Sequence, residues 1–130
     1  AAKELLDDLL EEGHFERAVE LLSRQFAAHP RDPDLALQLA EIHGSLDDAR
    51  MAARCLRHAV QLLQAEGRLA EARTALDQLD QVSEDDLLIS AARKRLDAGE
   101  AVEWDQIRSV LEHDQRRGLV HKLGSEMISR

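Results

Sequence analysis

Aromatic residues are scarce in this chain of 130 residues, which contains two phenylalanines, one tryptophan and no tyrosine. Leucine and alanine are abundant instead, and no segment alternates apolar and polar residues as a half-buried strand does. This composition argues against a β-sandwich and favours helices that approach one another closely. We therefore predict a single all-α domain over residues 1–130.

Cysteine is limited to Cys55, so no intramolecular disulfide can form and nothing indicates an oxidising compartment. The cytoplasm is then the default location. No segment approaches the roughly 18 uninterrupted apolar residues of a membrane-spanning helix, so direct membrane insertion is not expected. The chain begins without methionine and directly in a helical pattern, which suggests a segment of a larger protein.

Basic residues are outnumbered, because 17 lysines and arginines face 26 aspartates and glutamates, for a net charge of −9. Nucleic acids are bound through clustered Lys and Arg side chains that neutralise phosphates, and anionic lipid surfaces attract the same residues. A nucleic-acid partner or an anionic membrane surface is therefore not expected.

Patterns typical of enzymes are also missing: the chain has no His-x-x-x-His pair, no glycine pattern that cradles phosphate and no G-x-S-x-G elbow. Cys55 and His58 are three residues apart and could share a helix face. A structural zinc site needs four ligands, however, and no second Cys or His pair accompanies them. A catalytic or metal-dependent domain is the least favoured hypothesis, and no cofactor is expected.

Apolar residues recur at spacings of three and four along most of the chain, which predicts a series of helices. Asp32 and Ser83 are expected to cap two of them, and Ser45 with Asp48 resembles a capping box. The predicted helices cover about residues 5–12, 16–28, 33–44, 49–66, 69–79 and 83–98, followed by a seventh from about residue 103 and a short last one beyond Gly118.

Three of these helices begin with the same short motif, at residues 13–18, 47–52 and 67–72. In this motif a turn residue is followed five positions later by alanine. A unit that repeats at about 34 residues is typical of stacked helical hairpins. The predicted units are residues 1–32, 33–66 and 67–99, with capping helices over residues 100–130.

Large and small apolar residues occupy regular places in these units: Leu5, Leu9, Gly13, Phe15, Ala18 and Pro30, then Leu39, Ala40, Ala52, Leu56 and Ala59, then Ala91 and Ala92. This pattern resembles the tetratricopeptide repeat family, although Leu6 stands where the family prefers a small residue and the family's tyrosines are absent. The resemblance implies a right-handed solenoid of about seven helices in antiparallel hairpins. It also implies a non-catalytic scaffold that holds a peptide or helix of a partner protein in a concave groove.

By position in that family, the groove residues would be Lys3, Asp7, Leu37, Glu41, Arg54, Arg57, Gln61, Gln64, Ile89 and Arg93. Within the helix over residues 49–66, four of these residues recur at spacings of three and four, so one face offers guanidinium and amide groups to a carboxylate or a peptide backbone. The alternative is a solvated face, in which the arginines pair with Asp47, Asp48 or another acidic neighbour.

Trp104 is expected to fill the core of the last hairpin, and the alternative is a platform on which a ligand packs. A second functional hypothesis is a structural self-association module, in which an apolar edge near residues 107–127 pairs with another copy to form a homo-oligomer. Such a module would belong to a larger bacterial protein, which could be membrane-associated. The bacterial source is suggested only by richness in alanine, leucine and arginine.

Overall fold

The computed structural model describes the backbone of residues 2–128 and the side chains of residues 4–116. Over the described backbone the chain forms seven α-helices and no strand, which confirms the predicted all-α class. The helices are α1 (Ala2–Glu11), α2 (Phe15–Ala28), α3 (Pro33–Ser45), α4 (Ala49–Ala65), α5 (Leu69–Val82), α6 (Asp86–Asp97) and α7 (Trp104–Ile128). None of the described helices combines the length and the apolar character needed to cross a membrane.

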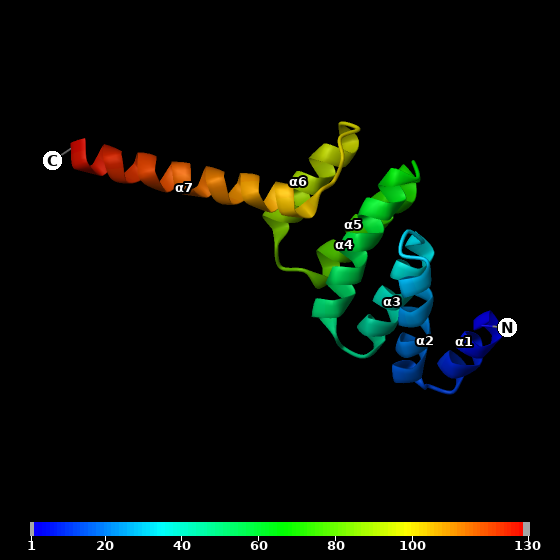
Figure 1. Ribbon diagram of the computed structural model, residues 1–130. Helices are drawn as coiled ribbons and strands as arrows, with labels where there is room; N and C mark the ends of the chain where they lie inside the picture. The colour runs from blue at the N-terminus through cyan, green and yellow to red at the C-terminus, as the bar shows by residue number, and fades with distance from the viewer. Residues whose placement is uncertain (1, 129–130) are drawn as a thin grey trace.

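Each helix packs mainly against its neighbours in the sequence. Figure 1 shows the first six helices following one another in chain order, with α1 at one end and α7 extending from the other. The most extensive contacts are those of α4, which packs against both α3 and α5. Residues on different sides of α4 therefore belong to different surfaces.

The repeated turn has the same backbone geometry at four places, where Gly13, Asp47, Gly67 and Gly99 have φ angles of 78°, 57°, 76° and 74°. The residue after each one donates its backbone N–H to the carbonyl five positions earlier. This is the Schellman ending of a helix, in which glycine avoids the steric conflict of a Cβ at positive φ. The alanines five residues after the first three turns are buried: Ala18, Ala52 and Ala72.

Aspartates cap three helices by accepting backbone N–H groups: Asp32 at α3, Asp48 at α4 and Asp85 at α6. Asp32 has the predicted role. The prediction that Ser83 caps α6 is wrong, because Ser83 ends α5 and its hydroxyl accepts the N–H of Asp85. The expected capping role of Ser45 is also wrong, since Ser45 lies within α3 and donates to the carbonyl of Glu41.

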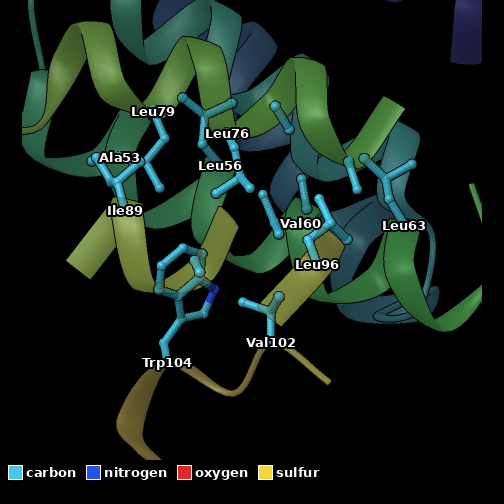
Figure 2. Packing of buried hydrophobic residues seen from close by; sticks show 14 of the residues in the cluster. Ala53, Leu56, Val60, Leu63, Leu76, Leu79, Ile89, Leu96, Val102 and Trp104 are labelled. Carbon is cyan, nitrogen blue, oxygen red and sulfur yellow. The ribbon is translucent and has the colours of Figure 1, made fainter. Parts of the chain in front are cut away.

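The buried core consists of two clusters, one over α1–α3 and a larger one over α3–α7. Phe26 and Cys55 pack against both clusters. In the larger cluster, Val102 and Trp104 lie close to the apolar side chains of α4 and α6, as Figure 2 shows. Trp104 is 6% exposed, in agreement with its predicted place as the plug of the last hairpin.

Three hydrogen bonds hold the connection between α6 and α7 against α4. The side-chain amide of Gln64 donates to the carbonyl of Glu100, and its oxygen accepts the N–H of Val102 at 2.7 Å. The indole Nε1 of Trp104 donates to the carbonyl of Arg57 at 2.8 Å. The start of α7 is thereby fixed on α4.

The expected break beyond Gly118 is wrong, because α7 is one helix of 25 residues and Gly118 lies inside it. A single glycine costs a helix only about 1 kcal/mol, and no proline follows to stop it. The predicted capping helices over residues 100–130 are therefore one helix, which extends away from the others in Figure 1. The apolar side chains expected beyond Gly118 lie outside the described side chains.

Candidate functional site

Two hollowed surfaces lie on different sides of α4. The first consists of two adjoining hollows of about 630 and 270 Å³, which share Gln38 and Glu41 of α3. We call this surface the α3 groove. It extends from Asp7 of α1, across Leu37 of α3, to Gln78 of α5.

The α3 groove combines acidic, amide and apolar side chains. Asp7, Asp34 and Glu41 supply carboxylates, three glutamines supply amides, and Leu10 and Leu37 are among the apolar residues. Among the described residues, no lysine or arginine lines it. The α3 groove is therefore a negatively charged strip with apolar patches.

The second surface is a hollow of about 600 Å³ between α2, α3, α4 and the start of α7. We call it the arginine hollow, because Arg54 and Arg57 of α4 line it together with His58 and Gln61. Its apolar wall comes from four helices: Phe26 of α2, Leu39 of α3, Met51 of α4 and Trp104 of α7.

The arginines of this hollow are not neutralised by a close carboxylate. Among the described side chains, neither Arg54 nor Arg57 forms an ion pair, so the predicted pairing with Asp47 or Asp48 is absent. Arg54 is exposed, as the predicted solvated face requires, whereas Arg57 is half-buried. Burial lowers the pKa of the Arg57 guanidinium, and the charges of Arg108 and Arg54 lower it further, whereas Asp85 acts in the opposite direction. Arginine nevertheless stays charged at neutral pH, so positive charge collects here in an acidic protein.

Cys55 and His58 both line the arginine hollow, but their arrangement does not favour nucleophilic or metal chemistry. Burial raises the pKa of the Cys55 thiol, which keeps it protonated and weakly nucleophilic at neutral pH. The His58 ring meets the ring of Phe26 edge-on, with centroids 5.2 Å apart. Within the described part of the chain, no three His, Cys, Asp or Glu side chains converge as metal ligands would.

The structure divides the predicted groove residues between the two surfaces. Asp7, Leu37 and Glu41 line the α3 groove. Arg54, Arg57 and Gln61 line the arginine hollow instead. The side of α4 that faces the α3 groove carries residues 52 and 56, and a helix turns by about 100° per residue, so side chains two positions further on point elsewhere. The single groove predicted from the sequence is therefore corrected to two surfaces.

The other predicted residues lie elsewhere. Ile89 is 2% exposed and packs in the core, so it cannot contact a partner (Figure 2). Gln64 holds the α6–α7 connection as described above. Arg93 forms an ion pair with Asp77 at 2.7 Å. The side chain of Lys3 lies outside the described residues.

Several lining residues were not among the predicted ones. Gln78 and Gln81 of the α3 groove are three residues apart on one helix face, which is a signal that the sequence does contain. No such signal marks Phe26 and Trp104, which line the arginine hollow. They line the same hollow only because α7 docks on α4, and no local pattern indicates that docking.

No protein-family model matches this chain, and neither the curated proteins nor the solved structures contain a match to it. What the chain binds is therefore inferred from the chemistry of the two surfaces.

Proposed function

We propose that this chain is a cytoplasmic, non-catalytic scaffold of the tetratricopeptide-like kind, which binds a peptide or helix of a partner protein in the α3 groove. The observation that carries the proposal is the pair of adjoining hollows along α1, α3 and α5. These alternate helices supply most of the lining, and Phe15 of α2 with Ala52 and Leu56 of α4 supplies the rest. In a solenoid of helical hairpins the leading helix of each hairpin lines the concave side. The four equivalent helix-ending turns and the packing of each helix on its neighbours support this architecture.

The lining of the α3 groove favours a partner segment with basic and apolar side chains. Asp7 and Glu41 would attract lysine or arginine, and electrostatic complementarity of this kind selects partners. Gln38, Gln78 and Gln81 can both donate to and accept from a peptide backbone. Leu37 offers apolar contact area between them.

Binding of a labelled peptide composed of lysine and leucine tests this proposal. Changing Asp7→Asn together with Glu41→Gln should weaken binding by about tenfold, because each lost contact of an exposed carboxylate contributes up to about 1 kcal/mol. The control is Glu11→Gln with Glu16→Gln, which makes the same change of net charge at exposed positions outside the groove. Equal weakening in both double variants would mean that the peptide senses only net charge, and the α3 groove would be rejected.

Self-association is a second candidate, and the extension of α7 beyond the other helices favours it (Figure 1). Val110 is 47% exposed on this helix, whereas Ile107 is buried in the core and cannot belong to a free apolar edge. Light scattering over a range of protein concentrations tests this candidate. A monomer at every concentration would remove it and leave the scaffold proposal intact.

A further inference from the structure

We propose that the arginine hollow is a second binding site, which takes a partner segment that presents a carboxylate beside an apolar side chain. This site lies on another side of α4 from the α3 groove, and it differs from it in charge. This proposal can therefore be tested independently of the function proposed for the α3 groove.

The arrangement of charge is the first argument. The chain has a net charge of −9, yet two guanidinium groups on adjacent turns of α4 line one hollow, and Arg108 is close enough to act on Arg57. Three carboxylates lie nearby: Asp105, which lines the hollow, Asp85, which acts on Arg57, and Asp48, which acts on Cys55. Among the described residues, none of them forms an ion pair with Arg54 or Arg57. A carboxylate from outside would gain the forked hydrogen bonds for which guanidinium is shaped.

The apolar wall is the second argument, because it distinguishes a polypeptide from a small free anion. Phe26, Met51 and Trp104 face the same hollow as the arginines. Covering such surface contributes about 25 cal/mol for each Å² removed from water, and only a ligand with an apolar group can do so. A glutamate or aspartate next to leucine or phenylalanine matches both halves of the lining.

The fixed position of Trp104 is the third argument. Its indole is held by the hydrogen bond to the carbonyl of Arg57 and by its packing in the core. Trp104, which belongs to the apolar wall, is therefore hydrogen-bonded directly to Arg57, which belongs to the charged wall. The hollow is thus formed before a ligand binds. Such preorganisation reduces the entropy lost on binding.

A short acidic segment also fits the chain better than a nucleic acid does. Nucleic acid carries a charge at every phosphate, so the acidic remainder of this protein would repel it. A segment with one or two carboxylates meets mainly the local positive charge, because repulsion from more distant exposed charges is screened over about 8 Å at physiological salt.

The test titrates the protein with a labelled peptide of glutamate, leucine and phenylalanine, and with a matched peptide in which lysine replaces each glutamate. The double variant Arg54→Gln with Arg57→Gln should bind the glutamate peptide about tenfold more weakly or worse. The control is Arg17→Gln with Arg50→Gln, which removes two exposed arginines that do not line the hollow and should retain the wild-type affinity.

Two probes built into the chain report where the peptide binds. Trp104 is the only tryptophan and Cys55 the only cysteine, and both line the arginine hollow. The glutamate peptide should change the fluorescence of Trp104 and slow the alkylation of Cys55. The lysine peptide, directed to the α3 groove, should do neither and should not compete with the glutamate peptide.

The outcomes separate this proposal from the function proposed for the α3 groove. Failure of the glutamate peptide to bind, or equal affinity in the Arg54/Arg57 variant and the wild type, would overturn the arginine hollow as a site. Displacement of the glutamate peptide by inorganic phosphate at a comparable concentration would reduce it to a small-anion site and reject the polypeptide ligand. Loss of lysine-peptide binding alone, in the Asp7/Glu41 variant, concerns only the α3 groove.

Discussion

The two surfaces beside α4 differ in charge and in how the chain builds them. The α3 groove is acidic, and most of its lining comes from the alternate helices α1, α3 and α5, with a smaller part from α2 and α4. The arginine hollow is basic, and its lining combines α2, α3 and α4 with the start of α7, which is far from α2 in the sequence. One helix with neighbours on two sides can therefore serve two surfaces of opposite charge.

Trp104→Ala is expected to have the most different effects on the two surfaces. Trp104 is buried, donates to the carbonyl of Arg57 and forms a wall of the arginine hollow only. Removing a buried indole should lower the free energy of unfolding by about 3–5 kcal/mol, measured by urea denaturation followed by circular dichroism. The glutamate peptide should lose affinity while the lysine peptide keeps it under conditions where the variant is folded.

Trp104→Phe is the matched control, because it keeps an aromatic ring and removes the hydrogen bond. It should lower the free energy of unfolding by only about 1 kcal/mol. If the alanine variant were as stable as the phenylalanine variant, Trp104 would not anchor α7, and the arginine hollow would lose its proposed wall.

A smaller effect, on the other side of α4, is expected for Ala52→Leu. Ala52 is 2% exposed and lies where α4 meets the α3 groove. Three additional carbons cannot enter this contact without moving helices, so the free energy of unfolding should fall by about 1–3 kcal/mol in the same denaturation measurement. Ala49→Leu, at an exposed position of the same helix, should change it by less than about 0.5 kcal/mol. Equal stabilities of the two variants would show that the face of α4 is assigned wrongly.

Ala52 and Gly118 show what the local sequence could predict and what it could not. Ala52 follows Asp47 by five residues, and that spacing together with the apolar period was sufficient to place it in a helix contact. Most helix limits were predictable for the same reason, since turn residues and apolar spacing are local signals. Gly118 shows the limit of such signals, because a glycine can end a helix or be tolerated within it at a cost of about 1 kcal/mol.

The surfaces were less predictable than the helices. The spacing of Arg54 and Arg57 indicated correctly that the two arginines line one surface. It could not indicate which neighbours flank α4, so the arginines were assigned to the same groove as Glu41. Ile89 was misplaced for a related reason: whether an apolar side chain is exposed depends on how α6 rotates against α4 and α5, and that is decided by tertiary packing.

Arg68→Gln tests whether a paired arginine behaves differently from those in the hollow, and its effect should be smaller than that of Ala52→Leu. Arg68 forms ion pairs with Asp34, Glu66 and Glu71, and these carboxylates raise the pKa of its guanidinium. The variant should unfold at a slightly lower urea concentration, and the difference should disappear at high salt because exposed ion pairs are screened.

The same variant should bind the lysine peptide slightly more tightly, since Asp34 lines the α3 groove and would lose its positive neighbour. Arg73→Gln, which breaks a single pair with Asp97, is the control for loss of an exposed arginine outside the groove. A salt-independent loss of stability in Arg68→Gln would contradict the ion-pair explanation.

The smallest change in the free energy of unfolding is expected for Arg57→Met. Arg57 can be compared directly with Arg68. The pKa of Arg68 is raised by its partners, whereas that of Arg57 is lowered by burial and by the charges of Arg108 and Arg54. A lowered pKa in a base means that folding disfavours its charged form on balance, so the attraction of Asp85 is outweighed and removing this charge withdraws no net favourable interaction from the folded chain.

Methionine also keeps most of the length of the arginine stem and has a similar helix propensity, so the free energy of unfolding should stay within about 0.5 kcal/mol of the wild-type value. The affinity for the glutamate peptide should nevertheless fall. A stability loss larger than about 1 kcal/mol would identify Arg57 as a structural residue. Unchanged stability with weaker binding would instead mean that this charge contributes to ligand recognition and not to folding.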